Sequence, residues 1–269
     1  LAQFIHNNTD VALITLLINV SEVSVYAVYY AVVSGIERII TSVSVGCAAG
    51  IGDVIARNEK EQLKNVTNLF EFVQSSIATI LFSVTGVLIV PFIQLYTHGV
   101  KDTNYVRPVF AYILVLAELF FCIRSIYSTV ILNAGHYKQT QINAIMEAIT
   151  NIFVSLIFIG KFGITGVAIG TLTGMLVRIG MDVLYLSKNI VFRSPILFFK
   201  CLTTNALVFI SSSLLSSFVQ VQITDWLSWI GKAAISMVIT VVVALIVYRI
   251  IYPEQLKSLI GRMKRIVSK

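Results

Sequence analysis

Ionisable side chains occur inside the most apolar stretches of this chain, where their chemistry would have the greatest effect. They are Asp10, Glu37, Arg38, Glu118 and Arg124. A carboxylate in such surroundings could bind a cation, and a guanidinium group could bind a phosphate through two parallel charged hydrogen bonds. Ionisable groups at the depth of a lipid bilayer face the interior of a helix bundle or a water-filled cavity. These residues are therefore the first candidates for a binding site.

The segment 21–59 holds two of these charges near its middle, and its other polar residues recur at helical spacing. The polar positions are Tyr26, Tyr30, Ser34, Glu37, Arg38, Thr41 and Ser44. A spacing of three or four residues places them on one face of a helix, whereas the opposite face carries valine and isoleucine. Glu37 and Arg38 diverge by about 100° on a helix, so they need not pair with each other. We predict that this face lines a cavity.

Asp10 belongs to a polar run that interrupts an otherwise apolar segment. Asn7 and Asp10 can share one helical face. Two interpretations stay open: these residues line a cavity that binds substrate or a coupling cation, or Asp10 clamps neighbouring helices through hydrogen bonds. An ionised carboxylate at this depth needs a partner or water in either case. Glu118 and Arg124 are six residues apart and point to different sides of a helix, so either could line the same cavity.

The remaining charges inside apolar segments are predicted to be structural. Two pairs lie four residues apart, the spacing of intrahelical contacts: Arg178 with Asp182, and Glu147 with Asn151. Asp53 and Glu71 are interpreted as charges at a helix end or in a loop, with a contact in a cytoplasmic gate as the alternative.

The composition determines the class of protein that holds these residues. Of the 269 residues, 57% are hydrophobic and 12% are charged, with a mean hydropathy of +0.88. Soluble domains carry roughly 25% charged residues, so we predict an integral membrane protein. The candidate spans are 1–20, 23–50, 67–97, 108–133, 142–160, 164–187, 196–219 and 228–251. The predicted fold class is an all-α membrane protein with about eight transmembrane helices, of which the first is too polar to span alone.

Lys and Arg residues are unevenly distributed between the two sets of connections. One set contains Arg57, Lys60, Lys64, Lys138, Lys188 and Arg193, and the alternate set contains Lys101, Arg107 and Lys161. Because basic residues concentrate in cytoplasmic loops, we predict a protein of the cytoplasmic membrane with both ends of this piece inside the cell. Tyr248 and Tyr252 would lie at the inner boundary as part of an aromatic belt. The basic, amphipathic tail, 252–269, is predicted to lie on the inner leaflet with its apolar side toward the lipid.

Other patterns concern packing and excluded chemistry. Gly166, Gly170 and Gly174 are four residues apart, a spacing that permits close contact between membrane helices. The three cysteines are scattered and the three histidines are isolated, so we expect no disulfide framework, no metal site and no cofactor. We expect no nucleic-acid partner either. The partners that remain are membrane lipids and a transported substrate.

Three stretches of the sequence are distinctive in combination. They are NNTDVALITLLI, VYAVYYAVVSGIERIITSVSVGCAAGIGD with the following ARNEKEQL, and KFGITGVAIGTLTG. Together they resemble the C-terminal half of bacterial polysaccharide-unit flippases, which belong to the exporter superfamily that includes multidrug and toxin extrusion proteins. The resemblance implies a V-shaped bundle of two lobes around a central cavity. The first two helices of each lobe would line that cavity, and here they carry Asp10 and Arg38.

The resemblance also implies a division of the chain and a function. Residues 1–190 would form one lobe, 191–251 two additional helices and 252–269 a tail, and the N-terminal lobe of the same protein would be a further partner. The substrate would be an undecaprenyl-pyrophosphate-linked oligosaccharide, flipped by alternating access for capsule or O-antigen biosynthesis. The expected cavity residues are Asn7, Asp10, Tyr26, Tyr30, Glu37, Arg38, Glu118 and Arg124. Arg38 would contact the pyrophosphate, and Tyr26 and Tyr30 would contact sugar rings.

Two other functions stay open at this point. A cation-coupled antiporter for drugs or small solutes would share the architecture and would rely on an acidic site. A membrane-embedded glycan polymerase or ligase would need a large external loop with catalytic groups, and the predicted outer connections are short. We therefore expect a transporter and not an enzyme.

Overall fold

The computed structural model describes the backbone of residues 2–257, 259 and 261 and the side chains of residues 9–257, 259 and 261. Within these residues the chain is helical without strands: α1 (Ala2–Leu17), α2 (Val20–Ala56), α3 (Lys60–Tyr96), α4 (Pro108–Asn133), α5 (Gln141–Phe162), α6 (Ile164–Asn189), α7 (Ile196–Phe218) and α8 (Trp226–Ile251). Seven of these helices, α2 to α8, are long and apolar enough to cross a membrane. The predicted all-α membrane fold is confirmed.

The first described helix packs beside three others. The 16 residues of α1 measure roughly 24 Å at 1.5 Å per residue. α1 packs against α2, α5 and α6. These neighbours supply the hydrogen-bond partners of Asp10, as expected for a polar residue in this segment.

α2 and α3 are both longer than the sequence predicted. Each has 37 residues, and only residues 57–59 separate them, where the sequence pattern indicated a connection over 51–66. Asn58 turns the chain with a positive φ of 57°. The charges of this stretch are compatible with helix because they pair along it: Arg57 Nη2 lies 3.0 Å from Asp53 Oδ2, and both side chains are exposed. Asp53 is thus a charge at a helix end, as interpreted.

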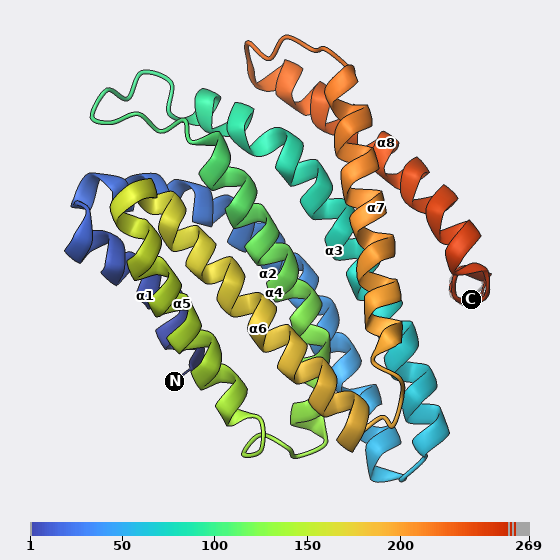
Figure 1. Ribbon diagram of the computed structural model, residues 1–269. Helices are drawn as coiled ribbons and strands as arrows, with labels where there is room; N and C mark the ends of the chain where they lie inside the picture. The colour runs from blue at the N-terminus through green and yellow to red at the C-terminus, as the bar shows by residue number, and fades with distance from the viewer. Residues whose placement is uncertain (1, 258, 260, 262–269) are drawn as a thin grey trace.

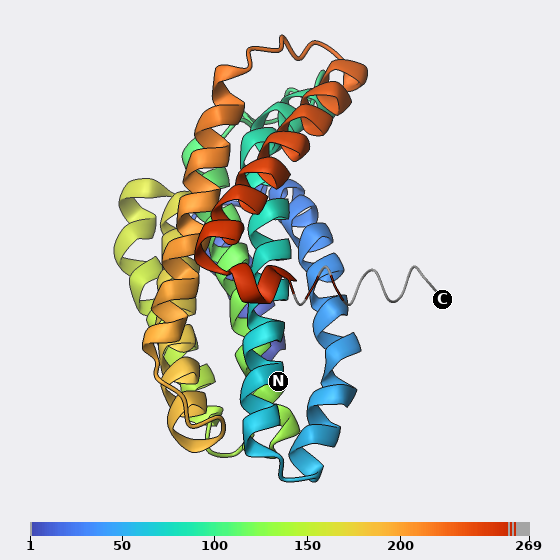
Figure 2. The same cartoon turned by 90° about the vertical axis from the view of Figure 1, so that its right-hand side faces the viewer.

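The helices form one bundle with α4 at its centre (Figure 1). α4 packs against α2, α3 and α6, while α5 packs on α6. Tyr127 and Phe110 of α4 are among the largest fully buried side chains. α7 and α8 lie together against α3, at the edge of the bundle away from α5 and α6 (Figures 1 and 2). The core therefore lies along α4, and α7 and α8 extend the bundle on one side.

Alternate connections lie at opposite ends of the bundle. The α2–α3, α4–α5 and α6–α7 connections are at one end, and the α3–α4, α5–α6 and α7–α8 connections are at the other (Figure 1). The first end carries Lys60, Lys138 and Lys188. The basic residues that were assigned to the cytoplasm thus share one end, and the direction of that end in a membrane stays a prediction.

The three glycines of α6 produce the tightest contact between helices. A Cβ atom built on Gly170 would lie 2.0 Å from Ser155 Oγ and 2.6 Å from Asn151 O. One built on Gly166 would lie 2.5 Å from the carbonyl carbon of Phe158. Such separations leave no room for a side chain, so α5 and α6 approach through backbone. The predicted packing role of the glycine stack is confirmed.

The interpretation of Glu71 as a charge at a helix end or in a loop is wrong. Glu71 lies inside α3 with 4% of its surface exposed, and its Oε2 is 2.5 Å from Nη1 of Arg193. The same carboxylate accepts a hydrogen bond from the Tyr127 hydroxyl at 2.5 Å. Arg193 is buried too, although its place in a basic connection suggested exposure. The pair forms because two charges that leave water need each other's compensation.

Candidate functional site

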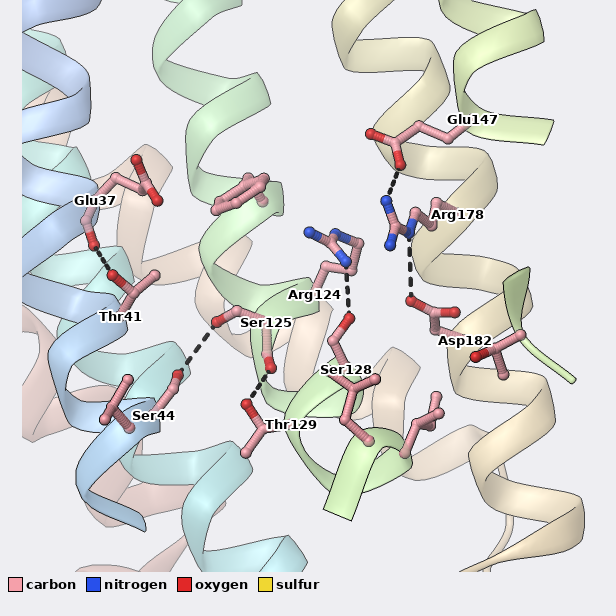
Figure 3. Close-up of a pocket in the computed structure, with 15 residues that line it drawn as sticks. Glu37, Thr41, Ser44, Arg124, Ser125, Ser128, Thr129, Glu147, Arg178 and Asp182 are labelled. Atoms are coloured by element: carbon pink, nitrogen blue, oxygen red, sulfur yellow. Dashed lines mark hydrogen bonds and ion pairs between the residues drawn. The ribbon is translucent and has the colours of Figure 1, made fainter. Parts of the chain in front are cut away.

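A polar cavity of about 460 Å³ lies between α2, α4, α5 and α6. It is lined by Glu37, Thr41, Ser44, Val45, Phe121, Arg124, Ser125, Ser128, Thr129, Ile131, Leu132, Thr140, Glu147, Arg178 and Asp182. Figure 3 shows α2 on one side, α4 at the back and α6 opposite, with polar side chains directed between them. Hydroxyl and charged groups in an otherwise apolar bundle make this the main candidate for a binding site.

One wall of the cavity is formed by the Arg178 cluster, which consists of Glu147, Arg178 and Asp182 (Figure 3). Arg178 Nη1 donates to Glu147 Oε2 across the α5–α6 contact. Arg178 Nε lies 3.8 Å from Asp182 Oδ2, one turn further along α6, and Asn143 Nδ2 donates to Asp182 Oδ1 at 2.8 Å. A single guanidinium is therefore shared between two carboxylates on different helices.

Arg124 occupies the floor of the cavity on α4. Its Nη1 donates to Ser128 Oγ at 2.7 Å, and its guanidinium lies 4.9 Å from the centroid of the Phe121 ring. The residue is 6% exposed, and its Nε has no hydrogen-bond partner among the described residues. Burial of a guanidinium without a full set of acceptors is costly. The Arg124 guanidinium can thus donate a further hydrogen bond to water or to an anion in the cavity.

A second hollow of about 370 Å³ lies along α2 on the side of α1. Its walls include Tyr26, Tyr30, Ser34 and Arg38. The Tyr26 and Tyr30 rings stack with centroids 5.7 Å apart. Arg38 is exposed, and its guanidinium makes no hydrogen bond or ion pair with the described residues. Glu37 lines the main cavity and Arg38 lines this second hollow, so these two adjacent residues of α2 face different spaces.

Asp10 lies in a closed group of hydrogen bonds, the Asp10 cluster, formed by Asp10, Tyr26, Asn151, Ser155 and Thr171. Asp10 Oδ2 accepts from Thr171 Oγ1 at 2.7 Å and from the Tyr26 hydroxyl at 3.2 Å. Asp10 Oδ1 accepts from Asn151 Nδ2 at 3.3 Å. Asp10 is 2% exposed. This geometry is that of a clamp joining α1, α2, α5 and α6, and its carboxylate, amide and hydroxyl oxygens are also of the type that hold small hard cations.

The structure distributes the predicted residues over these three places. Arg124 and Glu37 line the main cavity, Tyr30 and Arg38 the second hollow, and Tyr26 connects that hollow to the Asp10 cluster. Glu118 is buried in α4 and is not among the residues that line the two spaces. The side chain of Asn7 lies outside the described residues. The described residues of the predicted set are thus divided between two spaces and the Asp10 cluster, with Glu118 in none of them.

Sequence reasoning missed the Arg178 cluster as part of a site. Arg178 and Asp182 do lie within contact, but Glu147 bonds to Arg178 instead of pairing with Asn151. One signal in the sequence could have found this contact. Glu147 is the only charged residue in the predicted span 142–160, so its compensating cation had to come from another helix. Among the described residues no group of three or more His, Cys, Asp or Glu could hold a metal ion.

Comparison with known proteins finds similarity at the level of structure. No family model matches this sequence, and no curated protein gives a significant match. The structure of the lipid II flippase MurJ in an inward closed conformation matches with a TM-score of 0.69 and 18% identity, over 95% of this chain and 52% of that protein. An outward-facing multidrug resistance MATE family transporter of the MOP superfamily matches with a TM-score of 0.59 and 18% identity, over 92% of this chain and 61% of that one.

A third structure, a MOP superfamily transporter from Pyrococcus furiosus described as having a binding pocket of reverse polarity, gives a TM-score of 0.58 and 18% identity. It is matched over 62% of its length by 92% of this chain. The chain therefore spans about half to three fifths of the proteins that it resembles. At this identity the likeness concerns the fold alone: this is a multi-pass membrane protein with the fold of part of a MOP superfamily transporter.

Proposed function

We propose that this chain is one lobe of a membrane exporter that moves a lipid-linked oligosaccharide, carried on a pyrophosphate, across the cytoplasmic membrane. The observation that carries the proposal is Arg38. It is the middle residue of α2, it is exposed on the wall of a hollow, and its guanidinium has no hydrogen-bond or ion-pair partner among the described residues. A charge in that position requires something from outside this lobe to compensate it.

The depth of Arg38 adds to this requirement. It lies 18 residues after the start of α2 at Val20, which is roughly 27 Å along the helix. The hydrocarbon core is about 30 Å thick, so a helix that enters the core at Val20 brings Arg38 toward the opposite boundary, on the side predicted to be cytoplasmic. An unpaired Arg costs at least about 2.5–3.5 kcal/mol at the centre of a membrane helix and less toward its ends, where the side chain reaches the interface. A pyrophosphate would offset this cost through bidentate charged hydrogen bonds.

Other groups along α2 suit the rest of such a substrate. Tyr30 is half-buried two turns before Arg38 on α2 and lines the same hollow. Thr41 and Ser128 contribute hydroxyls to the main cavity of about 460 Å³. Hydroxyl-rich walls can exchange hydrogen bonds with sugar hydroxyls that must leave water. The likeness to a lipid II flippase over 95% of this chain supports a lipid-linked substrate.

A cation-coupled antiporter is the second candidate, and the charges of the main cavity favour it. That cavity holds three carboxylates, on Glu37, Glu147 and Asp182, against two guanidinium groups, on Arg124 and Arg178. An excess of acidic groups attracts cations instead of phosphates. The oxygen-rich Asp10 cluster would be the place for a coupling cation. Both functions require an intact lobe, so they are distinguished by the substrate and by Arg38.

The test uses the full-length protein in its own host, with the chromosomal copy removed. Arg38→Ala is expected to reach the membrane at the wild-type level and to abolish export, measured as surface glycan and as lipid-linked precursor retained inside. Arg38→Lys keeps the charge but loses the planar fork, so it should retain part of the activity. The matched control is Arg57→Ala, because Arg57 is exposed at the end of α2 and pairs only with Asp53.

The outcomes separate the two functions. Full glycan export by Arg38→Ala at matched membrane levels would eliminate the pyrophosphate site. Failure of Arg38→Ala to accumulate, with normal accumulation of Arg57→Ala, would make Arg38 half of an ion pair with another part of the protein. Drug efflux that depends on a sodium or proton gradient and is lost in Asp10→Asn would establish the antiporter.

A further inference from the structure

A separate charged site lies on the other side of the bundle, where α3, the start of α7 and the end of α8 meet. Its centre is the buried pair of Glu71 and Arg193, which are 4% and 7% exposed. Arg193 Nη1 contacts both Glu71 Oε2 and Asn68 Oδ1. The second carboxylate oxygen of Glu71 accepts from the Tyr127 hydroxyl. Glu71 is thus satisfied, and only one of the two terminal nitrogens of Arg193 is used.

The remaining edge of Arg193 has no acceptor. Its Nε and Nη2 are buried and have no hydrogen-bond partner among the described residues. These two nitrogens form the side of the guanidinium fork that matches two oxygens of one phosphate or carboxylate. Buried donors without acceptors are rare and call for an explanation such as a bound ion or water. The edge is therefore a preformed place for an oxyanion.

Arg193 also lines a small pocket of about 60 Å³. Arg193, Leu197, Tyr252 and Gln255 are among its lining residues. A pocket of this size holds a phosphate-sized group or a few waters. A ligand that uses it would insert a small polar head and leave the rest of its structure outside.

The surroundings of the pocket favour a negative charge. Lys200 is exposed, and its Nζ lies 4.8 Å from the centroid of the Tyr252 ring, which lines the pocket. Leu197 belongs to the first turn of α7, where the positive end of the helix dipole acts on bound anions. Glu71 and Arg193 cancel each other's charge. Lys200 and the start of α7 then leave the site positive.

The depth of the pocket identifies the source of such a phosphate. α7 has 23 residues and measures roughly 34 Å, just enough for a core of about 30 Å, so its first turn lies at the level of the headgroups. α8 ends at Ile251 beside α3 and α7 (Figures 1 and 2). Basic pockets between helices at this level bind anionic lipid headgroups. We propose that Arg193 and Lys200 hold the phosphate of an anionic phospholipid in this pocket.

The experiment uses the full-length protein, purified in detergent and stripped of lipid. Mixed micelles containing phosphatidylglycerol, the same micelles with phosphatidylcholine, and inorganic phosphate alone are titrated while the unfolding temperature is recorded. Phosphatidylglycerol is expected to raise that temperature in a saturable way, and phosphatidylcholine to leave it nearly unchanged. Lys200→Ala should weaken the apparent affinity about fivefold, the contribution of one basic residue at an anionic surface. Arg193→Lys should remove the saturable response.

Lys188→Ala is the matched control, because Lys188 is exposed at the same end of the bundle and does not line the pocket. The proposal is overturned if the two lipids stabilise the protein equally. It is also overturned if Lys200→Ala titrates like the wild type, as the control Lys188→Ala is expected to do. If Arg193→Lys does not accumulate in the membrane, the lipid titrations of Lys200→Ala and Gln255→Ala test the proposal instead. Equal stabilisation by inorganic phosphate that Arg193→Lys removes would support the phosphate pocket and assign it to a soluble anion instead of a lipid.

Discussion

The Asp10 cluster and the Arg178 cluster share α5 and α6, yet only the second lines the main cavity. Asn151 and Glu147 are four residues apart on α5 and contribute to one cluster each. Asp10, Asn151, Ser155 and Thr171 are all at most 4% exposed. Glu147 and Asp182 are buried to the same degree, but together with Arg178 they form a wall of a cavity of about 460 Å³.

The difference follows from the residues that surround each carboxylate. Asp10 receives hydrogen bonds from neutral donors on three other helices, which satisfies it without water. Glu147 and Asp182 share one guanidinium, and the space next to them is open. A charge held by neutral groups in a closed contact acts as a joint between helices. Charges beside a cavity can exchange partners with water or with a substrate, which is the behaviour that transport requires.

The largest effect is expected from opening the contact that keeps the Asp10 cluster closed. Gly170→Leu would force a side chain into Ser155 and the backbone at Asn151, because even a Cβ would lie 2.0 Å from Ser155 Oγ. We expect little or no folded protein in the membrane, measured by size-exclusion chromatography of a fluorescent fusion. Gly180→Leu on the same helix is the control, since a Cβ there meets nothing within 4 Å. Equal yields of the two variants would show that the glycine contact is not required.

A smaller loss is expected from removing the acceptor at the centre of the closed cluster. Asp10→Ala leaves the Tyr26 hydroxyl without its acceptor, and it removes one of two acceptors each from Asn151 Nδ2 and Thr171 Oγ1. Each buried donor left unpaired costs about 1–3 kcal/mol, so the unfolding temperature should fall markedly. Asp182→Ala should lower it less, because Arg178 keeps Glu147 and the cavity admits water. A larger loss in Asp182→Ala than in Asp10→Ala would reverse the assignment of the closed and open clusters.

The fold could be predicted from the sequence because each of α2 to α8 is apolar over a length that a bilayer requires. Composition, the eight segments and the glycine stack were all local signals, and the structure confirms them. The ends of α2 and α3 were predicted less well because paired charges such as Asp53 and Arg57 make polar residues compatible with helix outside the apolar core. Polarity marks the end of a membrane span, and a helix can continue beyond it.

The site was harder to predict because its contacts join residues far apart in the sequence. Glu71 and Arg193 are 122 positions apart by their numbers, and Asp10 and Thr171 are separated by 161. Spacing along one helix says which residues share a face, and it does not say which helix that face meets. The Arg178–Asp182 spacing correctly suggested a pair, but it concealed the third member, Glu147. Intramembrane charges therefore located the candidate site without giving the contacts between its residues.

The last prediction compares the two clusters by their access to water. In a background without Cys47, Cys122 and Cys201, the variant Thr129→Cys places a thiol on the wall of the main cavity, and Ser155→Cys places one inside the Asp10 cluster. A charged thiol reagent added to the purified protein should modify Thr129→Cys much faster. Thiolates are the reactive species, and a site without water neither ionises the thiol nor admits the reagent. Both substitutions preserve size closely, so both proteins should fold.

In intact cells the same reagent also reports the direction of the cavity. Thr129 lies on the half of α4 next to the α4–α5 connection, at the end of the bundle that carries residues 57–59 (Figure 1). If that end is cytoplasmic, a thiol at Asn58→Cys should resist an impermeant reagent added outside, and Thr129→Cys should react only when the protein opens outward. Labelling of Asn58→Cys from outside would reverse the orientation. Equal modification rates at Thr129→Cys and Ser155→Cys in the purified protein would mean that water reaches both clusters. That result would contradict the interpretation of the Asp10 cluster as a closed contact between helices.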